Sequence, residues 1–125
     1  MAIKVSRTRL DFGTVGMRNY AELVNALGNV SGTANIDYSL GNVVTATSAG
    51  DTTWNVLNPA SSGKASSFIL VLTNGGAYVQ SWFVGTKWPY DTAPTLTVSG
   101  VDVLSFFSTD GGATWRGVLS MRDSR

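Results

Sequence analysis

The side chains of this sequence that could take part in chemistry are carboxylates and hydroxyls, because its 125 residues include no His and no Cys. The chain therefore lacks imidazole bases, thiolate nucleophiles and the ligands of almost every zinc or redox-metal site. Asp91 and Asp102 could serve as the general acid and nucleophile of a glycoside hydrolase. However, their spacing fixes no separation, and no nearby cation is predicted to split their pKa values. We therefore expect neither an enzyme nor a cofactor or metal site.

A second possible nucleophile lies in a loop. Ser61, Ser62 and Lys64 are close enough in sequence to suggest a Ser/Lys dyad. The loop is rich in Ser and Gly, which is typical of a solvated connection rather than a rigid catalytic site. We interpret it as a linker between strands.

The aromatic residues suggest a binding site for sugars. Trp88 and Tyr90, with Asp91 beside them, could form a platform on which the apolar face of a sugar ring stacks. Trp54 and Trp82 lie within strand patterns and are predicted to be core residues. The competing interpretation is that Trp88 and Tyr90 cover the end of the core or contact another subunit. We favour packing.

Residues 108–115 match the S-x-D-x-G-x-T-W pattern of the Asp box, a hairpin repeat of sialidase-like β-propellers. In this motif the carboxylate, here Asp110, accepts N–H groups of the turn, and Gly111 and Gly112 take left-handed conformations. Trp115 is expected to pack beneath the hairpin. A single box in a chain too short for a ring of blades predicts a stable hairpin and not a propeller.

The N-terminal part of the chain, residues 1–30, is a basic arm. It contains four of the nine Lys and Arg residues of the chain, Lys4, Arg7, Arg9 and Arg18. These cations could contact nucleic acid, dock on an acidic protein surface or increase solubility. Nucleic acid is the weakest of these options, since the cations are spread out and no RNA-binding signature accompanies them.

The same arm carries an apolar pattern of helical period. The positions i, i+3, i+4 and i+7 are occupied by Tyr20, Leu23, Val24 and Leu27. Gly28 follows as a natural stop. The spacing predicts one short helix over residues 17–27.

From residue 31 onward the pattern has period two and predicts about eight short strands. Turn signals at Gly41-Asn42, at residues 74–76 and at residues 110–112 predict three hairpins. Residues 68–72 are apolar on both faces and are expected to form a central strand covered on both sides. The predicted fold is all-β, an antiparallel β-sandwich or jelly-roll-like module over residues 31–125.

Several stretches resemble a module that recurs in structural proteins of tailed bacteriophages. Residues 87–97 are similar to its W-P-x-x-x-A-P-T-L-T loop, residues 100–110 to its V-D-V-L-x-F-x-x-x-D-G strand and residues 114–117 to its T-W-x-G strand. Residues 35–43 resemble its x-L-D-x-S-x-G-N opening, and residues 57–59 its L-N-P turn. The resemblance covers most of the chain.

In that family the module commonly ends long tail-fibre-like or appendage proteins, whereas only about thirty residues precede it here. This difference favours a capsid decoration (cement) protein. The resemblance implies a homotrimer that bridges subunits of the major capsid protein on the virion surface, after assembly in the host cytoplasm. We expect no nucleic acid or membrane partner.

In this interpretation the arm docks on the capsid. Its cations would meet capsid carboxylates, and Tyr20, Leu23 and Leu27 would provide apolar anchors. The alternative is a tail-fibre tip or adhesin that recognises a host-surface polysaccharide. Its candidate contact residues are Trp88, Tyr90 and Asp91.

Overall fold

The computed structural model describes residues 13–125. The arm residues Lys4, Arg7 and Arg9 lie outside the described residues. Strands dominate the rest of the chain, and helical structure is confined to three short 3-10 turns. The prediction of an all-β, sandwich-like fold is confirmed.

Seven strands and three 3-10 turns follow one another along the chain. They are β1 (Val24–Asp37), η1 (Tyr38–Leu40), β2 (Val43–Leu57), β3 (Ser66–Thr73), η2 (Gly75–Ala77), β4 (Gln80–Ser81), β5 (Thr86–Lys87), η3 (Pro89–Asp91), β6 (Val101–Ser108) and β7 (Trp115–Met121). The hydrogen-bonded order is β1-β2-β3-β6-β7-β5, and β4 pairs with β2. The sheet is mixed rather than wholly antiparallel, because β2 is parallel to both β1 and β3.

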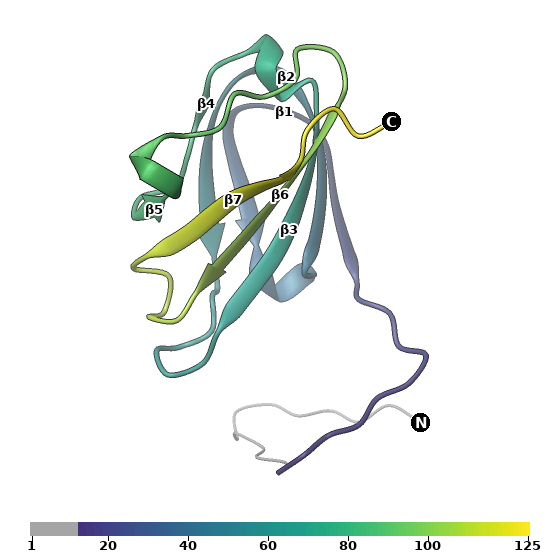
Figure 1. The fold of residues 1–125 in the computed structure, drawn as a ribbon, viewed down its shortest axis with the longest axis vertical. Coiled ribbons are helices and arrows are strands. Elements are labelled where there is room, and N and C mark those ends of the chain that lie inside the picture. Colours follow the sequence, from purple (N-terminus) through teal and green to yellow (C-terminus); the bar gives the residue numbers. More distant parts are fainter. Residues whose placement is uncertain (1–12) are drawn as a thin grey trace.

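The long strands β1 and β2 are bent into arches. They are parallel and pair from Val24↔Val43 to Asp37↔Leu57, with two shifts of register, although only residues 38–42 join them. A straight strand of 14 residues would be about 46 Å long, and such a short connection spans only about 20 Å. Each strand must therefore turn back on itself, as Figure 1 shows.

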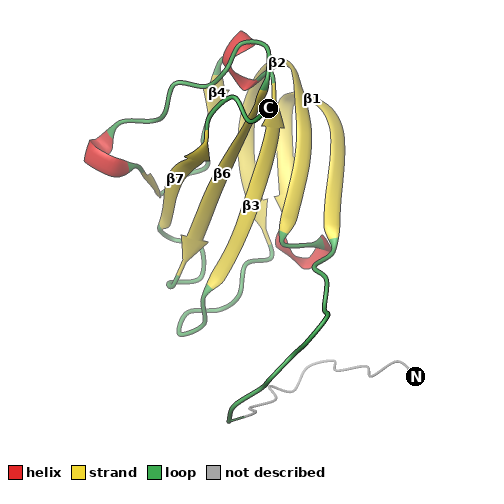
Figure 2. Ribbon diagram, turned by 45° about the vertical axis from the view of Figure 1, so that its right-hand side comes forward, coloured by secondary structure: helices red, strands yellow, loops and turns green. Residues whose placement is uncertain are grey.

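The arches create two layers from one continuous sheet. In β1 the bend lies between Gly28 and Gly32, both at positive φ (71° and 68°), which glycine adopts without steric cost. The register of β1 on β2 shifts at the same places. Figure 2 shows the first halves of β1 and β2 beside β3, β6 and β7 in one layer, with their second halves behind.

Two of the three predicted hairpins are wrong, because the bent strands create pairings other than those between neighbours in the sequence. Gly41-Asn42 does not join antiparallel partners, because the strands on either side of it, β1 and β2, run parallel. Residues 74–76 do not pair β3 with β4; β3 lies between β2 and β6, and β4 pairs with the second half of β2. The turn carries the chain from one layer to the other. The hairpin between β6 and β7 is present as predicted.

Gln80 forms a polar bridge in the core between the layers. The Trp54 indole N–H donates to Oε1 of Gln80 at 2.8 Å, and Nε2 of Gln80 donates to the Ser48 hydroxyl and the Gly75 carbonyl at 2.9 and 3.0 Å. These bonds tie β2 and β4 to the turn after β3. The apolar core surrounds them: Val30, Ala34, Ile36, Val44, Ala46, Phe68, Leu70, Leu72, Phe83, Leu96, Leu104, Phe106 and Trp115.

The predicted helix over residues 17–27 is absent. Residues 13–23 contain no regular element, and β1 begins at Val24, so the folded module starts before residue 31. Val24 pairs with Val43, and Leu27 packs against the core of the same chain. β-branched Val and the local Gly and Asn favour strand and turn over helix, and pairing with β2 decides the outcome.

Candidate functional site

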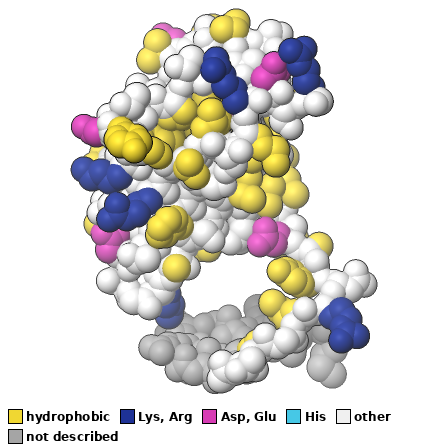
Figure 3. All heavy atoms as spheres, in the orientation of Figure 1, with side chains coloured by type: hydrophobic (Ala, Val, Ile, Leu, Met, Phe, Trp, Pro, Cys, Tyr) yellow, Lys and Arg dark blue, Asp and Glu magenta, His cyan; other side chains and the backbone are white. Residues whose placement is uncertain are grey.

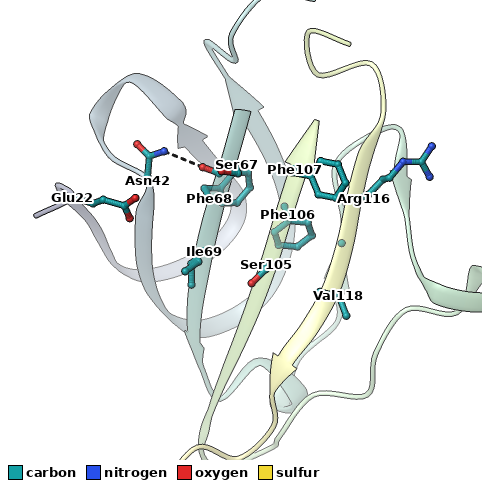
Figure 4. A pocket seen from close by; sticks show the side chains of 11 residues that line it. Glu22, Asn42, Ser67, Phe68, Ile69, Ser105, Phe106, Phe107, Arg116 and Val118 are labelled. Atoms are coloured by element: carbon teal, nitrogen blue, oxygen red, sulfur yellow. Dashed lines mark hydrogen bonds between the residues drawn. The ribbon is translucent and has the colours of Figure 1, made fainter. Parts of the chain in front are cut away.

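A shallow apolar groove lies on the outer face of the layer formed by β2, β3, β6 and β7. It encloses about 450 Å³. Figure 4 shows its lining: Glu22, Asn42, Ser67, Phe68, Ile69, Ser105, Phe106, Phe107, Arg116, Gly117 and Val118. Apart from the two charged groups at its margins, the groove is lined by apolar and small polar residues.

Strand alternation explains why this face is apolar. On β3 the side chains of Phe68, Leu70 and Leu72 point into the core, so those between them point outward. Ile69 on this outer face is 38% exposed, and Phe107 on β6 and Val118 on β7 are each 46% exposed. The prediction that β3 is covered on both sides is therefore wrong for the described residues, since nothing in them covers its outer face.

Two charges of opposite sign mark the ends of the groove. Glu22 comes from the arm beside the β1–β2 side, and Arg116 comes from β7 on the far side (Figure 4). Between them lie the backbones of β3 and β6. Figure 3 shows apolar side chains gathered on this face, in the orientation of Figure 1.

The described part of the arm extends away from the module. Residues 13–23 run below it in Figures 1 and 2, and all of their side chains are exposed. Among them are Arg18, Tyr20 and Leu23 of the predicted docking set, and also Val15 and Met17. Leu27 is the exception in that set, because it packs on the core of its own chain and is not free to anchor a partner.

The structure separates the residues of the proposed sugar platform. The Trp88 ring lies edge-on to Trp82 and Phe106, with centroids 5.4 and 5.5 Å away. Tyr90 is 101% exposed at the tip of the same loop, and Asp91 beside it is also exposed. Trp88 therefore contributes to the packing of the core, whereas Tyr90 does not.

An unusual backbone presents Tyr90. Tyr90 and Asp91 have φ values of 54° and 55°, a region that non-glycine residues rarely adopt. Two successive turns hold them there: the Asp91 N–H donates to the Trp88 carbonyl at 3.0 Å, and the Thr92 N–H to the Pro89 carbonyl at 3.1 Å. Loop geometry thus projects an aromatic ring into solvent.

The Asp-box residues close the β6–β7 hairpin. Oδ1 of Asp110 accepts the Thr114 N–H at 2.8 Å and the Ser108 hydroxyl at 2.9 Å. The Thr114 N–H, followed by the Ser108 hydroxyl, lowers the pKa of Asp110 below its ordinary value. Gly111 and Gly112 have φ values of 71° and 87°. Trp115 is buried beneath the hairpin, edge-on to Phe68 and Phe83.

Asp102 is fully buried and occupied by structural hydrogen bonds. It accepts the Thr97 N–H at 2.6 Å, the Thr97 hydroxyl at 2.7 Å and the Asp123 N–H at 2.8 Å. Burial raises the pKa of Asp102, but these hydrogen bonds outweigh it, and the net pKa lies below its ordinary value. Asp102 therefore fastens the 92–100 loop and the C-terminal segment to β6. The structure provides no acid and nucleophile pair from Asp91 and Asp102.

The possible Ser/Lys dyad is an exposed turn. Ser61, Ser62 and Lys64 are all exposed, and the Lys64 backbone N–H donates to the Ser61 carbonyl at 3.2 Å. Within residues 13–125 there is no cluster of three or more Asp or Glu side chains that could hold a metal ion. The same residues contain no helix with the length and apolarity needed to cross a membrane.

Two features were not predicted from the sequence: the groove, and the glycine on which the rings of Trp88 and Phe106 pack. A Cβ at Gly117 would lie 2.7 Å from a Phe106 ring atom and 2.8 Å from one of Trp88, so only glycine fits beneath both rings. The alternation of Val103, Ser105 and Phe107 opposite Leu104 and Phe106 could have revealed the outer apolar face.

No protein-family model, curated protein or solved structure matches the chain.

Proposed function

We propose that this protein is a non-enzymatic structural component of a phage virion, a homotrimer that decorates the capsid by bridging major capsid subunits. The observation that carries the proposal is the apolar outer face of the β3–β6–β7 layer with its groove. A contiguous apolar surface of this kind is characteristic of a protein that functions in an assembly. The resemblance of the sequence to a phage virion module supports the same conclusion.

The arrangement of the polar groups agrees with this role. Asp102 and Asp110 are engaged in hydrogen bonds that hold loops in place. The extended arm, with Arg18 and several exposed apolar side chains, has the form of a segment that reaches a neighbouring molecule. Arms of this kind add affinity in a symmetric oligomer, because several bind at once.

The proposal is tested by adding purified protein to phage particles that lack it. We expect the protein to co-sediment with the particles and to raise the temperature at which their heads release DNA. Protein that sediments only with isolated tails, or with neither heads nor tails, would contradict a decoration role.

A second candidate function rests on Tyr90. A fully exposed aromatic ring held by two left-handed residues suits a contact with an external ligand, which in a tail-fibre tip would be a host-surface polysaccharide. Binding of purified wild-type and Tyr90→Ala protein to host envelope fractions tests this candidate. Binding by the wild type that the variant loses would favour the adhesin.

A further inference from the structure

We propose that the arm of one copy lies in the outer groove of a neighbouring copy, with Glu22 of the first copy beside Arg116 of the second. This inference deepens the proposed self-association and rests on it. The groove is then the contact between subunits. Tyr20 and Leu23 bind a second copy of the protein rather than the capsid.

The arm and the groove both expose apolar side chains. The arm exposes Val15, Met17, Tyr20 and Leu23, and no described part of the same chain covers them. The groove exposes Ile69, Phe107 and Val118 on a sheet face that is equally uncovered. Burying each surface against the other would remove both from water.

The arm runs in a direction that leaves the groove of its own chain uncovered. Glu22 lies at the margin of the groove of its own chain, but the residues before it run away from the module and not across the groove. Figure 3 shows open space between this part of the arm and the module. In this conformation the arm leaves its own groove empty and is free to enter that of another copy.

The charges of the arm complement those at both ends of the groove. Arg18 and Glu22 are four residues apart, about 13 Å in an extended chain. The groove of one copy extends from its Glu22, just before β1, to its Arg116 on β7, which corresponds to four strand spacings or about 19 Å. The long side chain of Arg18 can span the few ångströms by which the groove exceeds the extended arm. An arm with its Glu22 at the neighbour's Arg116 therefore brings its Arg18 near the neighbour's Glu22. The opposite direction would place like charges together.

The contact also has the symmetry that the proposed function requires. Arm and groove are different surfaces, so each copy gives its arm to one neighbour and receives an arm from another. Such a head-to-tail contact closes into a ring when the rotation between copies allows it. A trimer is the ring expected here.

The absence of native Cys permits a direct test by disulfide trapping. In the full-length chain, Glu22→Cys is combined with Arg116→Cys, and the oxidised protein is run on a non-reducing gel. The two positions lie at opposite ends of one groove, too far apart for a bond within one chain. We expect bands of disulfide-linked dimers and trimers that disappear when the protein is reduced. The matched control, Glu22→Cys with Lys64→Cys, should remain almost entirely monomeric on the gel.

A charge inversion gives an independent readout. Light scattering should show that the wild type is a trimer and that Arg116→Glu shifts the oligomeric state toward the monomer. The trimer should return when Arg18→Glu, Glu22→Arg and Arg116→Glu are combined in one chain. Lys64→Glu, which makes the same charge change outside the groove, should behave as wild type. Circular dichroism establishes that each variant is folded.

The outcomes separate this inference from the proposed function. A wild-type trimer that persists in Arg116→Glu and gives no specific cross-link would overturn the arm-in-groove contact and leave the virion role standing. A wild-type protein that is monomeric both in solution and on particles would overturn the contact and the homotrimer together.

Discussion

The indole of Trp88 meets the ring of Phe106 edge-on, with centroids 5.5 Å apart and planes at 67°. Gly117 on β7 lies beneath both rings, and Trp82 adds a second edge-on contact to Trp88. Tyr90, two residues further along the same loop, touches solvent on every side. One loop thus performs two tasks, since Trp88 closes the core and Tyr90 is displayed.

Separate alanine substitutions should resolve these two tasks. Trp88→Ala removes a half-buried aromatic side chain and should lower the free energy of unfolding by about 2–4 kcal/mol. Tyr90→Ala removes no packing and should leave the melting temperature within error of wild type. Chemical denaturation of both variants measures the difference, and equal destabilisation by the two would contradict the division of roles.

Gly117→Ala should destabilise the module although it adds only one methyl group. Its Cβ would approach the rings of Phe106 and Trp88 to within 3 Å, so one ring or the β7 backbone must move. Overpacking of this kind costs about 1–3 kcal/mol. The control is Gly16→Ala in the arm, where a Cβ meets no atom within 4 Å. If urea titration found Gly117→Ala as stable as the control, the packing described beneath Trp88 would be wrong.

Asp102 should make stability depend on pH in the acid range. Its folded-state pKa lies below the ordinary value of about 3.8. The carboxylate therefore stabilises the fold above that pH, and this contribution is lost as the pH falls through the lower folded-state pKa. Asp102→Asn should cost about 2–3 kcal/mol at pH 7, because an amide cannot accept the same bonds as a carboxylate.

The measurement is thermal unfolding of wild type and Asp102→Asn from pH 7 to pH 2. The difference in stability should narrow in acid. The control variant Asp91→Asn, at an exposed position, should track the wild type throughout. A difference between wild type and Asp102→Asn that widened in acid would contradict the assignment.

Asp110→Ala should loosen the terminal hairpin. It removes the acceptor for the Thr114 N–H and the Ser108 hydroxyl, so we expect a small decrease in melting temperature. Hydrogen exchange should show faster exchange of amides in residues 108–115 than in β2. The variant should still assemble, and loss of a glycan-cleaving activity in a folded variant would contradict the structural role of the Asp box.

Removal of residues 1–18 should leave the module folded and prevent its incorporation into particles. The described residues of this segment are exposed and outside the sheet, which begins at Val24. Circular dichroism should show an unchanged strand spectrum, and particle sedimentation should show the loss of binding. Normal incorporation of the truncated protein would refute a docking role for the arm.

The sequence allowed prediction of those parts of the fold that depend on local residues. Period-two alternation identified strand structure from residue 31 onward, including β3, β6 and β7, and the glycines at 111 and 112 identified the terminal hairpin. The change of layer after β3 could not be predicted, because a turn at Asn74 serves equally well to pair two strands or to pass from one layer to the other. Only pairing with β2, distant in sequence, decides between them. The spacing of Tyr20 to Leu27 matched a helix by coincidence.

The candidate site was harder to predict than the fold. The apolar character of both faces of β3 was visible in the sequence, and it suggested a strand covered on both sides. Whether a second layer covers Ile69 depends on where the other strands go. The left-handed conformation of Tyr90 follows from two turns that no local motif specifies.

Electron cryomicroscopy of the phage particle in which we propose this protein to be a component is the most direct test of its role. We expect density for the sandwich in clusters of three at symmetric positions on the outer surface of the head, each cluster touching more than one major capsid subunit. Density for the protein only at the tip of the tail, or as isolated single copies on the head, would contradict the trimeric decoration protein proposed here.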